Sequence, residues 1–498
     1  MNSEGTGDRG RGTGAVLVVA VAVVALVQSW QRWLDPIIDT GRDLYIPEQL
    51  ARGAALYRDL RYQYPPLAPY LLALMPGRTL AAYTILGIAQ SAVIAASLWI
   101  ALRRNAIAAT VAALLFVAVS LCAGSMWNFI FPYSYAATLG MMFLTIALAA
   151  AVNERPAIAF GALFLASWCK VEYAAGVALI VVVLAIARRV SLRQVAVFAA
   201  VWIASAAVVM RVLPGIGDNV FALTNATARR FFAAVAGRPS WDHALALLGI
   251  VAVALLLRRG LWWLAMPLMI PLAYHGFFRA WFFIQIALLV YALVRERDSL
   301  LAVFAIFSIA ATLRVPFNLS PAWYGVVLIV PVYALIAYAL FERWPSRAWL
   351  FLVAMLCARD LWEQHERWRT KIYPVVTARG TFYDDNAARA RALNEFKPSG
   401  TLAVFPEGIA IDYLTRTTTT LSFHTFTPVE TADPRVEDAI LREIAARPPD
   451  RVALVARSVR EYGHRGFGVD YDERLAHWIF ANYAVERRWP GLLDLRRR

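Results

Sequence analysis

Charged side chains are scarce in this sequence. They make up 17% of its 498 residues, against about a quarter in an average soluble domain, while hydrophobic residues reach 60% and the mean hydropathy is +0.55. Most of the charge lies at the edges of apolar runs or after residue 357. This distribution excludes a string of ordinary soluble domains. It predicts one large helical membrane domain followed by a water-soluble tail.

The sequence is also poor in cysteine and lysine. Cys122, Cys169 and Cys357 lie in or next to apolar segments without zinc-ligand spacing, so we expect buried, inert thiols. The net charge of +15 comes almost entirely from arginine. These arginines cluster in short loops between apolar runs, which is typical of positive-inside membrane topology and argues against nucleic-acid binding.

The apolar runs predict a polytopic α-helical membrane protein. A span needs roughly 20 apolar residues, and this length criterion gives about 11–13 transmembrane helices. The runs cover residues 15–34, 79–101, 105–121, 134–152, 157–170, 173–187, 194–212, 243–257, 260–275, 280–294, 299–313, 322–341 and 347–361. The first run is long enough to span and no small-residue cleavage site follows it, so we expect an uncleaved helix with a cytoplasmic N-terminus.

Charge alternation predicts the topology. Each expected cytoplasmic loop carries arginine, and an odd number of spans places the C-terminus in the periplasm of a bacterium. We therefore expect a multi-pass domain over residues 1–361 in the cytoplasmic (inner) membrane, with long outward loops at 35–78 and 213–242. Residues 362–498 form a small periplasmic α/β domain, with strands expected at 401–405 and 451–456 and helices at 384–396, 434–446 and 470–482.

The first outward loop holds three evenly spaced carboxylates. Asp35, Asp39 and Asp43 would share one face of a helix, where they repel one another unless a cation or an acceptor hydroxyl uses them. Partial desolvation at the membrane boundary would raise the pKa of such a group and suit it to act as a general base. Helix capping and interfacial solvation remain the alternative. A short amphipathic helix from Pro47 to Gly53 is expected along the membrane surface.

Motifs in this loop resemble a known enzyme class. An acidic residue after the first span is followed by G-x-x-L-Y-x-D at 53–59 and by Y-P-P-L at 64–67. This pattern resembles GT-C integral membrane glycosyltransferases, and more closely the bacterial members of the protein O-mannosyltransferase/aminoarabinose transferase superfamily. The segments 404–408, 412–415, 458–462 and 467–471 resemble the outer C-terminal domain of such members.

The resemblance implies a mechanism. These enzymes take a sugar from a polyprenyl-phosphate donor at the outer membrane face, with inversion and with a catalytic aspartate in the first outward loop. The best match is Asp39, before Gly41 and Arg42. The family's acidic pair is interrupted because Thr40 follows Asp39, which leaves Asp35 and Asp43 as rivals. The acceptor would be a lipid, a glycan or a protein.

Further site candidates follow from this mechanism, which needs positive charge for the departing phosphate. The donor-phosphate candidates are Arg42, Arg58, Arg61, Lys170, Arg279 and Arg314. Lys170 is the strongest, because an ionisable residue within a span is costly, although pairing with Glu172 or snorkelling would also explain it. The sugar-pocket candidates are Glu172, Tyr64, Trp127, Tyr133, His275 and Tyr324, for which interfacial packing is the alternative. No spacing demands a metal ligand set, and the class includes enzymes with and without a divalent cation.

Two other functions compete with catalysis. An intramembrane Lys170 and Glu172 would suit the substrate path of a transporter or lipid flippase, and an envelope assembly protein would need no chemistry. Transporters usually show internal repeats, which this sequence lacks. The acidic first loop and the outer C-terminal domain favour the transferase.

Overall fold

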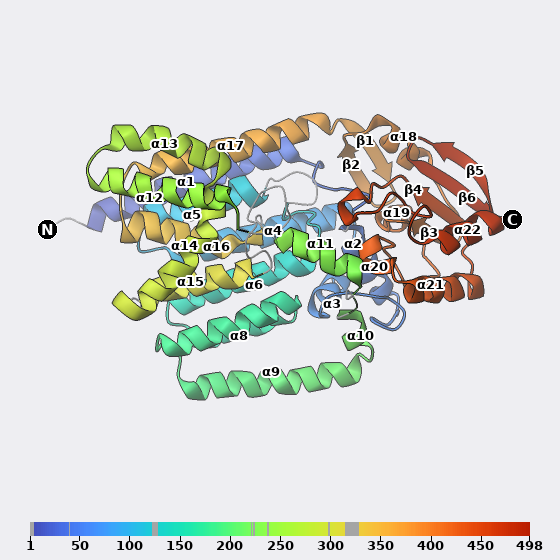
Figure 1. Cartoon of the computed structure of the whole chain (residues 1–498), viewed down its shortest axis with the longest axis horizontal. Coiled ribbons are helices and arrows are strands. Elements are labelled where there is room, and N and C mark those ends of the chain that lie inside the picture. The colour runs from blue at the N-terminus through green and yellow to red at the C-terminus, as the bar shows by residue number, and fades with distance from the viewer. Residues whose placement is uncertain are drawn as a thin grey trace.

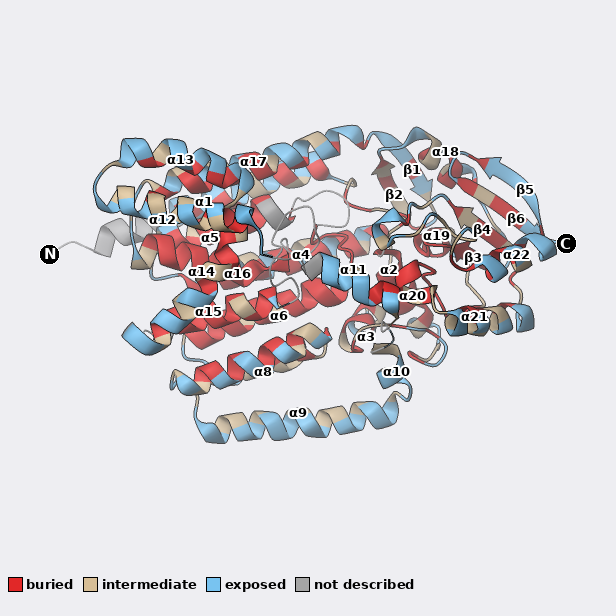
Figure 2. Ribbon diagram, viewed as in Figure 1, coloured by how far each residue is buried: buried red, intermediate tan, exposed pale blue. Residues whose placement is uncertain are grey.

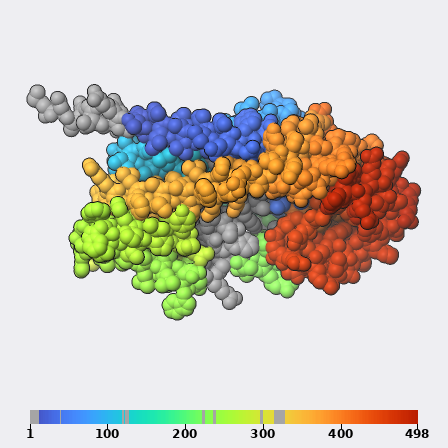
Figure 3. Space-filling model, turned by 90° about the horizontal axis from the view of Figure 1, so that it is seen from above, coloured from blue at the N-terminus to red at the C-terminus, as the bar shows by residue number. Residues whose placement is uncertain are grey.

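Long helices form an elongated bundle in the computed structural model, and the C-terminal residues form one end of it (Figures 1 and 3). The structure describes residues 4–38, 40–121, 128–220, 222, 225–236, 239–296, 299–313 and 328–498. The bundle helices are α1 Glu4–Ser29, α4 Leu80–Ala101, α5 Ala106–Phe116, α6 Tyr135–Val152, α7 Pro156–Ser167, α8 Val171–Ile186, α9 Leu192–Val212, α12 Trp241–Arg258, α13 Trp262–His275, α14 Phe277–Tyr291, α15 Ser299–Thr312, α16 Val330–Ala337 and α17 Trp349–Thr370. Every predicted apolar run overlaps one of these helices.

Six described helices are long and apolar enough to cross a membrane, and four shorter helices are apolar. The remaining apolar runs are interrupted. Pro267 and Pro271 lie inside α13, and α16 passes directly into a π-helical segment, Tyr338–Arg343. A proline inside a helix removes a backbone hydrogen bond, so these segments are shorter or irregular. The polytopic helical fold predicted from the sequence is confirmed.

Burial differs sharply between the helices. α6 lies at the centre of the bundle and most of its residues are buried, whereas α9 lies at the edge and has no buried residue (Figures 1 and 2). The exposed side chains of α9 include Val197, Ile203 and Met210. One face of α9 packs on α7 through Phe198 and Trp202, and the rest of this apolar helix is exposed. So large an exposed apolar surface is stable in lipid and not in water, so α9 identifies a lipid-facing side.

The loops predicted to be cytoplasmic contact one another at one end of the bundle. The Asn153 side chain donates to the Ile100 carbonyl at 3.2 Å, and the Asn105 side chain donates to the Phe341 carbonyl at 2.9 Å. Arg189 pairs with Glu154 at 2.9 Å. The two predicted outward loops join the C-terminal domain instead, which separates the two sets of loops as the charge alternation predicts.

The C-terminal part contains a four-stranded sheet of order β3-β4-β6-β5. β3 and β4 are parallel, and the other two pairs are antiparallel. The strands are β1 Tyr373–Thr377, β2 Gly380–Asp384, β3 Leu402–Phe405, β4 Arg451–Val455, β5 Tyr483–Trp489 and β6 Leu492–Arg497, and the helices are α18 Ala387–Glu395, α19 Ala410–Thr415, α20 Pro428–Thr431, α21 Pro434–Ala446 and α22 Glu473–Asn482. Both predicted strands and all three predicted helices are present.

Four strands were missed by the sequence pattern. β1 and β2 form a separate antiparallel hairpin, and β5 and β6 carry arginine and acidic side chains that hide their alternation. The predicted domain boundary after residue 361 falls within α17, which extends from the bundle to the C-terminal part (Figure 3).

The first outward loop contains two helices, α2 Thr40–Ala51 and α3 Leu67–Ala73. α2 is buried from Thr40 to Gln49, so the predicted start at Pro47 and the predicted surface position are wrong. The cause is a contact distant in sequence, because α2 packs on α19. A Cβ on Gly41 would lie 2.3 Å from the Ala410 backbone nitrogen, so only glycine allows this approach. The second outward loop contains α10 Ile216–Val220 and α11 Ala226–Ala236.

Of the two cysteines that the structure describes, Cys169 is buried as expected, whereas Cys357 is partly exposed. Cys122 lies outside the described residues.

Candidate functional site

Asp43 anchors the first turn of α2 to the bundle. Its Oδ2 accepts a hydrogen bond of 2.6 Å from the backbone N–H of Tyr135, the first residue of α6, and its Oδ1 lies 3.5 Å from the Tyr62 hydroxyl. A carboxylate at a helix N-terminus satisfies an otherwise unpaired N–H and interacts favourably with the helix dipole. Burial raises the pKa of Tyr62 well above its usual range, so this phenol stays a neutral donor. The Asp43 carboxylate therefore has a structural role in joining α2 to α6.

Arg42, next to Asp43, faces the ring of Tyr64. Its guanidinium carbon lies 4.9 Å from the ring centroid, and its Nη2 lies 3.5 Å from the Tyr64 hydroxyl. The Nε of Arg42 is 3.6 Å from Asp43 Oδ1, and both side chains are buried. A buried guanidinium with a carboxylate beside it keeps its charge and presents a planar fork of N–H donors, which suits phosphate recognition.

Lys170 approaches the same tyrosine from the junction of α7 and α8. Its ammonium nitrogen lies 4.3 Å from the Tyr64 ring centroid and 3.4 Å from the Tyr133 hydroxyl, and it pairs with Glu172 at 3.1 Å. Only 2% of the Lys170 side chain is exposed, whereas 27% of Glu172 is. We call Arg42, Tyr64, Tyr133, Lys170 and Glu172 the cation cluster.

The backbone that carries Tyr133 is fixed by hydrogen bonds from distant segments. The Thr40 hydroxyl donates to the Pro132 carbonyl at 3.0 Å, and the Asn128 side chain donates to the Trp33 carbonyl at 3.2 Å. The same Asn128 side chain accepts from the N–H groups of Ile130 and Phe131. The segment before α6 is therefore held against the end of α1 and the start of α2, which positions Tyr133 beside Lys170.

Other predicted site residues make their contacts elsewhere. Asp35 accepts hydrogen bonds from the backbone of Ile37 and Ile38, which caps a local turn. Arg58 is exposed and pairs with Asp59 at 2.9 Å.

Two further candidates belong to α13 and α14. Arg279 pairs with Asp242 of α12 at 2.9 Å, and His275 is the exposed last residue of α13, with its ring 6.4 Å from Tyr274.

Arg61 packs on Phe423 of the C-terminal domain, with its guanidinium carbon 4.0 Å from the ring centroid. The structure thus brings Arg42, Tyr64, Tyr133, Lys170 and Glu172 together and places these other residues outside their contacts. Asp39, Trp127, Arg314 and Tyr324 lie outside the described residues.

A buried ion pair near the site had no signal in the sequence. Glu48 of α2 pairs with Arg379, which lies between β1 and β2, and 7% and 8% of these side chains are exposed. Arg379 also donates to the Tyr413 carbonyl at 3.1 Å. The partners are more than 300 residues apart, so no local pattern links them. Tyr62 and Tyr135 were missed for the same reason.

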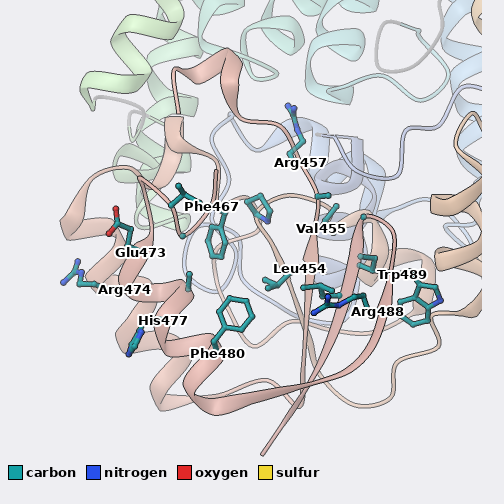
Figure 4. A pocket seen from close by; sticks show the side chains of 18 residues that line it. Leu454, Val455, Arg457, Phe467, Glu473, Arg474, His477, Phe480, Arg488 and Trp489 are labelled. Carbon is teal, nitrogen blue, oxygen red and sulfur yellow. The ribbon is translucent and has the colours of Figure 1, made fainter. Parts of the chain in front are cut away.

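A separate cavity of about 1090 Å³ lies in the C-terminal domain (Figure 4). Its lining residues all fall between 406 and 493, and they include Phe467, His477 and Arg488. This cavity therefore belongs to the C-terminal domain and not to the cation cluster. Within the described ranges there is no group of three or more His, Cys, Asp or Glu side chains that could hold a metal ion.

The comparison with solved structures identifies the fold. The crystal structure of ArnT from Cupriavidus metallidurans bound to undecaprenyl phosphate superposes with a TM-score of 0.57, covering 97% of this chain and 97% of that one at 14% sequence identity. The chain therefore has the ArnT fold. No protein-family model matches the sequence, and no curated protein matches it either. The ArnT likeness covers the bundle and the C-terminal domain together, so it confirms the predicted GT-C-like architecture.

Proposed function

We propose that this chain is an inverting glycosyltransferase of the bacterial cytoplasmic membrane. It moves a hexosyl or pentosyl group from a polyprenyl-phosphate donor to a lipid, glycan or protein acceptor at the outer face. The observation that carries the proposal is the placement of two buried cations, Arg42 and Lys170, on the ring of Tyr64. The ArnT structure that shares this fold is bound to undecaprenyl phosphate, which supports a lipid phosphate as the ligand.

The cations stabilise the leaving group in this proposal. As the bond between the anomeric carbon and the phosphate oxygen breaks, negative charge grows on the polyprenyl phosphate. Arg42 and Lys170 offer N–H donors to that charge in a site where low exposure strengthens electrostatic attraction. The phenols of Tyr64 and Tyr133, which contact the cations, would orient the phosphate or a sugar hydroxyl.

Asp39 is the proposed general base. It directly precedes α2, two residues before Gly41 and three before Arg42. The rival carboxylates have other partners, since Asp43 accepts from the Tyr135 N–H and Asp35 accepts from the N–H groups of a local turn. A carboxylate at this position would remove the proton of the acceptor hydroxyl while the sugar is transferred with inversion.

The test is incubation of the purified protein with a panel of polyprenyl-phosphate sugars, followed by mass spectrometry. We expect transfer or hydrolysis with at least one donor, and loss of turnover without loss of donor binding in Asp39→Asn. Turnover from none of the donors would favour a transporter or an assembly protein. Full activity in Asp35→Asn, Asp39→Asn and Asp43→Asn would overturn the assignment of the base.

A further inference from the structure

A small pocket of mixed polar and apolar lining lies where the two predicted outward loops meet the C-terminal domain. Its volume is about 60 Å³. The polar residues that line it are Arg42, Arg61, Gln63, Asn219, His424, Thr425 and Glu430. We call it the junction pocket. Arg42 lines the junction pocket and also belongs to the cation cluster, so the pocket adjoins the proposed phosphate site.

His424 lines this pocket with its hydrogen-bonding capacity unused. The side chain is 5% exposed, and neither ring nitrogen has a hydrogen-bond partner among the described residues. Its ring is tilted against Tyr45, with the centroids 5.4 Å apart. Burial, reinforced by the charge of Arg42, lowers the pKa of His424 to about 3, so the imidazole is neutral at physiological pH. A neutral imidazole has one donor nitrogen and one acceptor nitrogen. Buried polar groups are rarely left in this state, which indicates that a ligand completes the site.

The rest of the wall is held in place by contacts across the domain junction. The Gln63 amide donates to Glu430, and the Arg61 backbone N–H donates to the Ser422 carbonyl at 2.9 Å. Asn219 accepts from the Tyr62 N–H at 3.3 Å. The exposed Arg61 side chain packs on Phe423, and no ion pair holds its guanidinium within the described part of the chain. Hydrogen bonds therefore hold the Gln63 and Asn219 side chains before a ligand arrives, whereas the Arg61 guanidinium packs on Phe423 and keeps its N–H donors for a ligand.

Resting on the proposed transferase function, we propose that the junction pocket is the acceptor subsite and that it takes the hydroxyl-bearing edge of a carbohydrate. Hydroxyls both donate and accept, so two hydroxyls of one sugar edge can match the donor nitrogen and the acceptor nitrogen of His424, whereas a phosphate only accepts and an ammonium only donates. A volume of about 60 Å³ holds roughly four waters at about 15 Å³ each, so it admits one edge of a sugar ring and not a whole lipid headgroup.

The transfer that follows is balanced. The acceptor oxygen forms the bond to the anomeric carbon of the donor sugar. The bond from that carbon to the phosphate oxygen breaks, and its electron pair leaves on the polyprenyl phosphate. The hydroxyl proton passes to a carboxylate of the first loop. His424 and Arg61 position the acceptor and take no part in bond breaking.

The experiment uses the full-length protein in detergent with a donor that the panel identifies. Lipid A and maltotetraose are offered separately as probes, which distinguishes a lipid-borne from a soluble carbohydrate. In His424→Leu we expect the acceptor KM to rise about tenfold while donor hydrolysis in water stays within about twofold of wild type. His424→Asn keeps a donor and an acceptor and should restore most of the affinity. His477→Leu, an exposed histidine of the same domain, is the matched control.

Binding of the probes is also measured without a donor, by hydrogen exchange of residues 419–426. Protection by one probe in wild type and its loss in His424→Leu support the proposal and name the carbohydrate source. Equal acceptor KM values in wild type and His424→Leu overturn it, and so does the absence of protection by both probes. If no donor is turned over by the wild type, the proposed function fails, while the exchange data still decide whether the pocket binds carbohydrate.

Discussion

Lys170 is the residue whose placement the sequence predicts best. A charged lysine inside a membrane-spanning stretch costs free energy, so its presence indicates a specific partner. The structure gives it Tyr64, Tyr133 and Glu172. The pairing with Glu172, which the sequence left as an alternative to phosphate binding, is present, and phosphate binding by Lys170 stays a prediction. The tyrosines that surround Lys170 could be named only as aromatic residues at segment ends, because their partners lie in other segments.

We expect Lys170→Met to lower kcat/KM for a polyprenyl-phosphate sugar by about 10- to 100-fold. The reason is the loss of one charge-assisted hydrogen bond to the leaving phosphate, which is worth about 1.5–3 kcal/mol. The measurement is the initial rate of sugar release with purified protein. Lys397→Met removes an exposed lysine of the C-terminal domain and should leave the rate unchanged. Equal rates for Lys170→Met and wild type would exclude Lys170 from the donor site.

We expect the buried His424 side chain to make the stability of the folded protein depend on pH. The pKa of this side chain is about 3 in the folded chain and about 6.5 when unfolded, because burial disfavours the charged form. Below about pH 6.5 the unfolded chain binds a proton that the folded chain does not, so stability falls as the pH is lowered towards 3. Between pH 7 and pH 5 the loss is about 2 kcal/mol, at about 1.4 kcal/mol per pH unit below 6.5.

The check is the thermal midpoint in detergent at pH 7 and pH 5, for wild type and His424→Asn. The wild-type midpoint should fall more on acidification than that of the variant. Identical falls would show that His424 is already charged or solvated in the folded protein.

At the scale of elements, α2 could be predicted to exist but not to be buried. Its sequence alternates apolar and charged residues like a surface helix, and its neighbour α19 lies more than 350 residues further along the chain. Spans such as α4, α6 and α9 were located from apolar length alone, because a membrane helix must supply all its own backbone hydrogen bonds. The strands β5 and β6 could not be located in this way, because their charged residues obscure the alternation of apolar and polar side chains.

The contact between α2 and α19 can be tested at Gly41. In Gly41→Ala the new Cβ would meet the Ala410 backbone at 2.3 Å, and overpacking of this kind costs about 1–3 kcal/mol. We expect a lower thermal midpoint. Gly161→Ala is the control, because a Cβ there meets nothing within 4 Å and should stabilise its helix by up to about 1 kcal/mol. A midpoint that rises in both variants would contradict the close packing.

The ion pair between Glu48 and Arg379 ties α2 to the β1–β2 hairpin. Glu48→Gln leaves the buried Arg379 without a carboxylate and should destabilise the protein by about 3–5 kcal/mol. Arg379→Met should cost less, because Glu48 keeps its pairing with Arg52. The double variant should be less destabilised than the sum of the two single variants. Thermal midpoints of all four proteins give the coupling energy, and strict additivity would show that the two side chains do not interact.

For the whole molecule, the architecture could be predicted from the length of the apolar runs, the placement of arginine and the first-loop motifs. The two loops predicted to face outward and the C-terminal domain meet at one end of the bundle, through contacts such as that between Asn225 and the Val429 carbonyl. Loop charge gave the correct grouping because each span reverses the chain direction. Which outward residues meet was not predictable, since Arg58, Arg61 and Arg279 look alike in sequence and have three different environments.

The proposed function requires the cation cluster to hold a polyprenyl phosphate. Native mass spectrometry of the detergent-solubilised protein with undecaprenyl phosphate, and with undecaprenol as the phosphate-free control, tests it directly. We predict that wild type retains undecaprenyl phosphate in preference to undecaprenol, and that the double variant Arg42→Met/Lys170→Met loses this preference. Equal retention of the two lipids by wild type, or an unchanged preference in the double variant, would contradict the account.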